Sequence, residues 1–228
     1  MSLITEIGHV ALKPGFGGDA YKIDTQVGKA LQLVIDSVLN FGAVAAHWAM
    51  SDEHPDRFNV FVDWHSVDEH NEYIKAPTFA AVQDALIPII AGNSFIYHTE
   101  TAVTSVFDDK AYPTVEVISL PFPADITEDR RKEVEKRFDE CMDKALLKVG
   151  LCGKISRAWS LEKDVAVPGE DDKTCIMLTG LISWPSKQVH LENREKQEFK
   201  DNIHLLREMP QLIKLDVHHV DARSQYKK

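Results

Sequence analysis

Cysteine is scarce in this sequence, and the few cysteines have no arrangement that suggests a disulfide framework. The 228 residues contain three cysteines, Cys141, Cys152 and Cys175, an odd number at spacings that match no metal-binding motif. Cysteines of this kind are typically buried free thiols, and thiols stay reduced in the cytosol. We therefore expect a cytoplasmic protein without disulfides.

Long apolar runs and excess positive charge are also missing. No run approaches the ~18 apolar residues that a transmembrane helix needs, and residues 1–6 lack the basic and apolar regions of a signal peptide. The 26 Lys and Arg residues face 36 Asp and Glu residues, for a formal net charge of −10. Because nucleic acids and anionic lipids bind basic surfaces, we expect neither a nucleic acid nor a membrane as partner.

A glycine-rich phosphate-binding motif is absent as well. The nearest candidate, Pro14–Gly18, contains three glycines after a predicted strand. Its spacing fits neither the dinucleotide fingerprint nor the P-loop, and no Gly-Lys-Ser/Thr follows it. The segment is expected to be a flexible connection, and we expect no organic cofactor.

What the sequence does contain is an internal repeat at a constant offset of 120 residues. The repeated positions are Trp64, Ser66, His70, Glu72, Phe79 and His98, which recur as Trp184, Ser186, His190, Glu192, Phe199 and His218. Such a repeat predicts two copies of one structural unit. We expect one unit over residues 1–107, a second over 113–221, and a frayed tail over 222–228.

The pattern of apolar residues predicts the same order of elements in both halves. Alternation predicts strands over 4–13, 43–50, 57–64 and 94–99, and again over 114–120, 154–161, 174–184 and 213–220. Helices are expected to begin at Asp24, at Ser66, at Thr127 and at Ser186, each of which is a good helix cap. Each half therefore reads β-α-β-β-α-β, an α+β unit of the ferredoxin-like type.

The repeated motif carries a resemblance to known proteins. It consists of a strand that ends in Trp, a Ser two residues later, a helix with His or an aromatic residue, and a Phe fifteen residues after the Trp. It resembles the dimeric α+β barrel superfamily, which includes the antibiotic-biosynthesis monooxygenase (ABM), EthD-like and stress-responsive barrel families, in a tandem fused form. The resemblance implies a monomer with an internal pseudo-dimer, or a homodimer.

The superfamily implies several activities. Its members include cofactor-free monooxygenases of polyketide quinones, decarboxylases and cyclases of secondary metabolism, haem-degrading enzymes, chlorite dismutases and proteins without known chemistry. Haem-degrading members place their ligating His where this chain has Gln83 and Ile203. His204 is one residue away, which turns its side chain by about 100° around a helix. Haem degradation is therefore disfavoured.

Histidines on predicted strands are the candidate catalytic groups. There are ten histidines in the chain, and the first strand of a ferredoxin-like sheet lies beside the fourth, which can bring His9 and His98 together. A neutral imidazole in an apolar pocket suits general-base chemistry, with Asn59 or Tyr97 as a donor. The alternative is that these histidines only form hydrogen bonds within the sheet. A metal site is not expected, because His218 and its neighbour His219 point to opposite faces of a strand.

Four further residues are candidates for substrate binding: His47, Phe61, Asp63 and Tyr73. Asp63 shares one face of the third strand with Phe61, where it can line a polar pocket or a solvated edge. Tyr73 can contact an aromatic ligand or belong to the core. His70 and His190 recur at the same repeat position, which favours packing or hydrogen bonding over catalysis.

Two functions of different classes remain open. The first is an enzyme of secondary, aromatic or polyketide metabolism that uses general acid/base catalysis without an organic cofactor, for oxygenation, decarboxylation or cyclisation/isomerisation of a small apolar or aromatic molecule. The second is a non-catalytic ligand-binding or stress-response barrel. We expect the pocket between sheet and helices within residues 1–105, because Pro121 and Pro123 stiffen the corresponding loop of the second half, whereas Pro14–Gly18 is flexible.

Overall fold

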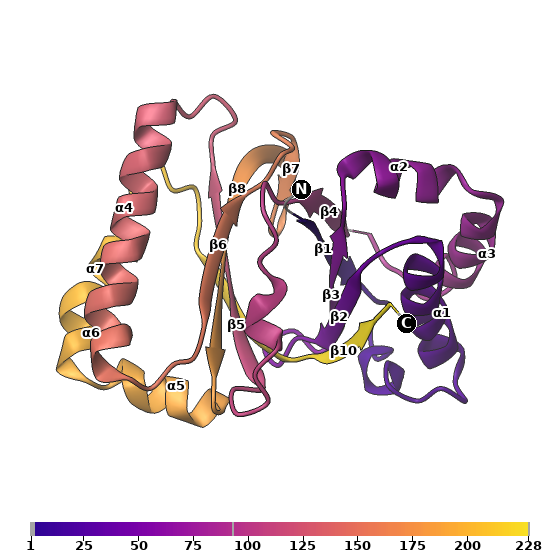
Figure 1. The fold of residues 1–228 in the computed structure, drawn as a ribbon, viewed down its shortest axis with the longest axis horizontal. Coiled ribbons are helices and arrows are strands. Elements are labelled where there is room, and N and C mark those ends of the chain that lie inside the picture. Colours follow the sequence, from indigo (N-terminus) through magenta and orange to yellow (C-terminus); the bar gives the residue numbers. More distant parts are fainter. Residues whose placement is uncertain (1–2, 93, 228) are drawn as a thin grey trace. The chain divides into compact units, whose positions relative to one another are not determined.

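The computed structural model describes residues 3–92 and 94–227, and it divides into two compact units. The first unit runs to Thr104 and also takes in the chain from Val220 onward, and the second unit is Ser105–His219. In each unit the helices lie on one face of an antiparallel sheet (Figure 1). The two predicted ferredoxin-like repeats are confirmed.

The first unit follows the predicted order of elements. It contains β1 (Ile4–Ala11), α1 (Gln26–Phe41), β2 (Ala45–Met50), β3 (Arg57–Trp64), α2 (Val67–Lys75), α3 (Pro77–Leu86) and β4 (Phe95–His98), with a short 3-10 turn η1 (Gly17–Asp19). A second 3-10 turn, η2 (Thr104–Phe107), contains the point in the chain where the second unit begins. The strand order of its sheet is β10-β2-β3-β1-β4. Pro77 begins a separate helix, α3, at its first position.

The second unit repeats this order with more segmented helices. It contains β5 (Thr114–Phe122), α4 (Glu128–Ala145), η3 (Leu147–Val149), β6 (Ile155–Trp159), β7 (Val165–Val167), β8 (Glu170–Trp184), α5 (Lys187–Arg194), α6 (Gln197–Asn202), α7 (His204–Arg207) and β9 (Asp216–Asp221). The strand order is β6-β8-β5-β9, and β7 pairs with β8.

Side-chain caps start the helices that carry the repeat. Ser66 accepts a hydrogen bond from the backbone N–H of Glu69, and Ser186 does the same for Val189. These bonds satisfy amide groups that the first turn of a helix leaves unpaired. They also place the residue four positions after each serine on the first turn of its helix. The helix α1 is capped by Thr25 rather than by Asp24, the expected residue.

The chain end differs from the expected frayed tail. Residues Arg223–Tyr226 form β10, which pairs with the edge strand β2. Ser224 Oγ lies 2.8 Å from His47 Nδ1, and the guanidinium of Arg223 lies 4.2 Å from the ring centroid of Tyr21. A polar tail forms a strand here because an open sheet edge offers its backbone hydrogen-bond partners, whatever the local hydropathy.

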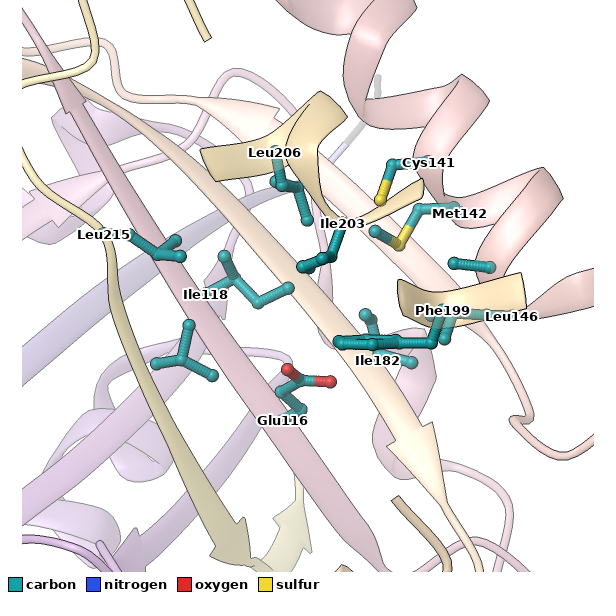
Figure 2. A pocket seen from close by; sticks show the side chains of 12 residues that line it. Glu116, Ile118, Cys141, Met142, Leu146, Ile182, Phe199, Ile203, Leu206 and Leu215 are labelled. Atoms are coloured by element: carbon teal, nitrogen blue, oxygen red, sulfur yellow. The ribbon is translucent and has the colours of Figure 1, made fainter. Parts of the chain in front are cut away.

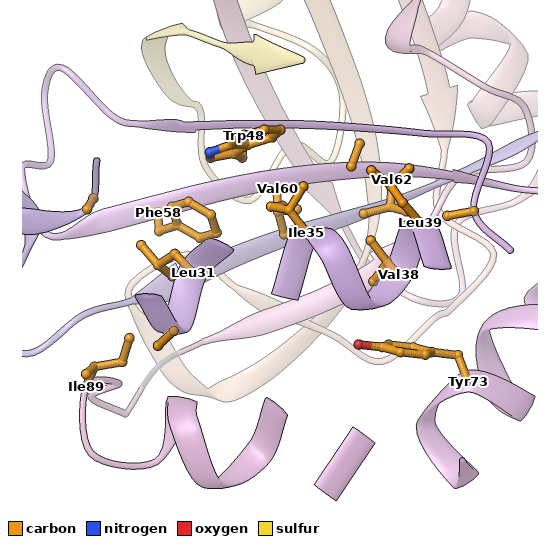
Figure 3. Close-up of a cluster of buried hydrophobic side chains, with 14 of the residues drawn as sticks. Leu31, Ile35, Val38, Leu39, Trp48, Phe58, Val60, Val62, Tyr73 and Ile89 are labelled. Atoms are coloured by element: carbon orange, nitrogen blue, oxygen red, sulfur yellow. The ribbon is translucent and has the colours of Figure 1, made fainter. Parts of the chain in front are cut away.

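The core of the first unit lies between α1 and the sheet. Figure 3 shows Leu31, Ile35 and Val38 of α1 packed against Val60 and its neighbours on β3, and all are buried. Each such side chain contributes about 1.5–3 kcal/mol when it is fully buried. Among the described residues, no helix is long and apolar enough to cross a bilayer.

Candidate active site

The register of β1 decides which candidate residues meet. Glu6 pairs with His98 of β4, whereas His9 pairs with Phe95 of β4 and with Asn59 of β3. Since neighbouring residues of a strand point to opposite faces, Glu6 and His98 share the face that carries the helices. His9 lies on the other face. The expected pairing of His9 with His98 is therefore not formed.

Three buried polar residues meet beneath the helices of the first unit. His98 Nε2 lies 2.8 Å from His70 Nδ1, and His70 Nε2 lies 3.6 Å from Glu6 Oε2. The indole N–H of Trp64 donates to the same Glu6 oxygen over 2.7 Å. We call Glu6, His70 and His98 the first-unit triad. The expected hydrogen-bonding role of His70 is confirmed, and it connects a helix to two strands.

The first-unit triad borders an apolar pocket between the sheet and the helices. The pocket has a volume of about 410 Å³. Its polar members are the triad and Asn71, together with Tyr73. Its apolar members are Val10, Leu31, Val34, Val38, Phe58, Val60, Val62, Ile74, Phe79, Val82, Leu86 and Ile96. Burial raises the pKa of the Tyr73 phenol above its ordinary value, so Tyr73 stays protonated at neutral pH and remains a hydrogen-bond donor.

The second unit contains the same constellation. His190 Nδ1 lies 2.6 Å from His219 Nε2, and His190 Nε2 lies 3.6 Å from Glu116 Oε2. Trp184 donates its indole N–H to that Glu116 oxygen over 3.1 Å. We call Glu116, His190 and His219 the second-unit triad.

The counterpart of His98 is thus His219, and the predicted match with His218 is wrong. His70 and His98 are 28 positions apart, whereas His190 and His219 are 29 apart. One additional residue before β9 turns His218 to the opposite face of the strand, where its Nδ1 lies 3.9 Å from Asp216.

The two units differ in the space beside their triads. In the second unit the corresponding chamber is about 40 Å³. Figure 2 shows Cys141 and Met142 reaching into it from α4, with Ile203 and Leu206 on the segment that follows α5. These side chains fill the volume that is open in the first unit. The larger of these two pockets lies in the first unit, but no residue of Pro14–Gly18 lines it.

Most of the expected site residues lie on the other face of the first sheet. His9 Nδ1 lies 2.8 Å from Asn59 Oδ1, and the His9 ring contacts Tyr97 at 6.4 Å between centroids. Asp63 accepts hydrogen bonds from the hydroxyls of Thr5 and Thr104. That face also carries His47 and Phe61, which pair across β2 and β3.

Of the eight expected residues, only His98 and Tyr73 line the first-unit pocket. The hydrogen bonds of Asp63 hold the segment after β4 against β1, which is a structural task. Glu6 was missed as a functional candidate. The sequence contained a clue to it: Glu6 and Glu116 are both carboxylates near the start of the first strand of their unit.

The described residues form two ferredoxin-like α+β units in one chain. No protein-family profile matches the chain, and no curated protein sequence does. Solved structures do match it. An anthrone oxidase-like protein superposes with a TM-score of 0.68 at 11% identity, over 99% of this chain and 93% of that chain.

Two further structures cover both units. A candidate monooxygenase from Fusobacterium nucleatum has a TM-score of 0.60 at 10% identity, over 99% of this chain and 95% of its own. Another from Lactobacillus acidophilus has a TM-score of 0.57 at 8% identity, over 100% of this chain and 97% of its own. At these identities the likeness concerns the fold, and fold alone does not assign chemistry.

Proposed function

We propose that this chain is an enzyme that oxygenates a small, flat, largely apolar molecule in the first-unit pocket, with His98 as general base. The observation that carries the proposal is the combination of an apolar volume of about 410 Å³ with a buried carboxylate–imidazole–imidazole triad at its wall. Convergent polar groups in an otherwise apolar pocket are the usual form of a small-molecule site.

One hydrogen bond and one ion-pair contact within the triad suggest the role of each ring. An ionised Glu6 favours a proton on His70 Nε2, which lies 3.6 Å from its oxygen. His70 Nδ1 then accepts from the Nε2–H of His98 over 2.8 Å. This tautomer leaves the lone pair of His98 on Nδ1, which accepts the substrate proton. Glu6 and His70 act as positioning residues that stabilise the imidazolium formed at His98.

The chemistry that follows needs only dioxygen as a second substrate. Loss of a proton from an activated CH₂ to His98 leaves a carbanion delocalised over the aromatic rings. The carbanion is oxidised by O₂, and the resulting hydroperoxide loses water, so that R₂CH₂ and O₂ become R₂C=O and H₂O. Tyr73 is placed to donate a hydrogen bond to the oxygen of the delocalised anion. The anthrone oxidase-like neighbour supports a substrate of this class.

The test is oxygen consumption with anthrone-type and hydroquinone-type substrates. His98→Ala is expected to lower kcat/KM by about 10²–10⁴. His219→Ala removes the equivalent ring of the second unit and is the matched control, with kcat/KM expected to stay within about twofold of wild type. Product formation without oxygen uptake would instead indicate a decarboxylase or cyclase.

Two outcomes contradict the proposal. If His219→Ala abolishes turnover while His98→Ala does not, the reacting unit is the other one. If these aromatic compounds bind saturably but no product forms from any of them, the chain is a ligand-binding protein.

A further inference from the structure

The first-unit triad also has the composition and spacing of a metal site. Among the residues that the structure describes, Glu6, His70 and His98 are the group that offers three ligand atoms within 4.8 Å of one another, and all three are buried. We propose that this triad binds one divalent transition-metal ion of the Zn²⁺ or Co²⁺ type, and that the bound ion prevents His98 from acting as a base. The first statement is independent of the proposed function, and the second rests on it.

The ligand atoms must rearrange to share one ion. Metal–nitrogen and metal–oxygen bonds of about 2.0–2.2 Å place the ligand atoms of a tetrahedral site about 3.3–3.6 Å apart. His70 Nδ1 and His98 Nε2 are 2.8 Å apart, so the two rings must separate by about 0.5–0.8 Å. The three ligand atoms lie within 4.8 Å of one another, and the Glu6 carboxylate, which lies 3.6 Å from His70 Nε2, must move toward the ring nitrogens that bind the ion. Two imidazoles with one carboxylate form a donor set that several first-row metals accept.

Proton positions change when the ion enters. His98 must move its proton from Nε2 to Nδ1, because Nε2 becomes the ligand atom. The lone pair that accepts the substrate proton is thereby lost. A carboxylate ligand offsets part of the metal charge. Trp64 holds the Glu6 carboxylate through its indole N–H over 2.7 Å, as an outer partner commonly holds a ligating carboxylate.

Access distinguishes the two units. An ion with three protein ligands needs room for a fourth ligand, such as water or substrate. All three residues of the first-unit triad border a pocket of about 410 Å³, whereas only Glu116 of the second-unit triad borders a chamber, and its volume is about 40 Å³. The imidazole nitrogens of the second-unit triad are also closer, at 2.6 Å. We therefore assign one ion per chain, bound in the first unit.

The experiment is a titration of the chelator-treated, full-length protein with Co²⁺, monitored through its visible ligand-field absorption. The expected result is saturation at one Co²⁺ per chain and displacement by Zn²⁺. His70→Ala and Glu6→Gln are each expected to weaken binding by at least about 10–100-fold. His190→Ala, the matched variant of the second-unit triad, should bind as tightly as wild type.

The outcomes are separable from those of the proposed function. Wild-type protein without a saturable Co²⁺ band overturns the metal site, whatever its activity. A band that survives His70→Ala, or one that is lost equally in His190→Ala, overturns the assignment to the first-unit triad. If Co²⁺ binds as expected but does not inhibit oxygen consumption at the same concentrations, the exclusion between metal and base is wrong. If the protein binds Co²⁺ at this site but shows no turnover, the metal site is supported and only the oxygenase proposal is wrong.

Discussion

Replacing Glu6 and Glu116 by Gln, one at a time, separates the structural role of the carboxylates from their role in activity. The two carboxylates are matched in environment, with exposed fractions of 6% and 7%. Each accepts an indole N–H, over 2.7 Å from Trp64 and 3.1 Å from Trp184, and each lies 3.6 Å from an imidazole Nε2. A Gln oxygen can still accept the indole N–H, but it no longer carries a charge.

The expected stability losses are therefore similar. Hydrogen bonds to charged groups contribute about 1.5–3 kcal/mol and neutral ones about 0.5–1.5 kcal/mol, so each variant should lose about 1–2 kcal/mol in the free energy of unfolding. Urea unfolding measures this loss. Glu6→Gln is expected to lose slightly more, because its indole hydrogen bond is the shorter one.

The expected activity losses are different. Glu6→Gln should lower kcat/KM by about 10–100-fold, less than removal of the base itself. Glu116→Gln should keep the wild-type kcat/KM. Equal activity losses in both variants, or full activity of Glu6→Gln, would refute the assignment of Glu6 as a positioning residue.

Four further outcomes test other parts of the structure. Burial raises the pKa of Cys141 and of Cys175 to about 12, so both thiols are protonated at pH 8, and a thiol reagent should label them only after unfolding. Ser224→Ala should lower the free energy of unfolding by about 0.5–1.5 kcal/mol, and truncation of residues 222–228 should lower Tm further, as calorimetry would show. Gly17→Ala should lower Tm strongly because its new Cβ would meet the Pro55 carbonyl oxygen at 1.7 Å, whereas the Cβ of Gly18→Ala meets nothing within 4 Å; equal thermal shifts of the two variants would contradict this. Haem should give no Soret band that survives gel filtration with the wild-type protein.

Local patterns were sufficient for most of the secondary structure. Helix caps such as Ser66 and Ser186 satisfy their own amides, and apolar stripes recur at the helical period, so both act within a few residues of the chain. The strand β10 was not predictable in this way. Its polar residues pair only because β2 presents an open edge, and β2 lies far from them in the sequence.

The candidate site was predicted less completely. His98 and Tyr73 were expected and do line the pocket. The loop Pro14–Gly18, from which a pocket in the first half was expected, does not line it. Glu6 and His70 were not expected to take part in chemistry. The repetition of His70 as His190 favoured a structural role for both residues. The repeated residues do not reveal that the space near them differs between the two units.

The sequence by itself determined that the chain contains two copies of one α+β unit, because the motif Trp64–Phe79 recurs 120 residues later and both halves show the same order of capped helices and alternating strands. Only the tertiary structure decided that His98 meets Glu6 while His9 turns away, because the face of a strand residue depends on the pairing register with its neighbour. It also decided that the first-unit triad borders about 410 Å³, whereas Glu116 of the second-unit triad borders about 40 Å³. That difference arises from how Met142, Leu206 and their neighbours pack in three dimensions, and such packing is not encoded in any local period.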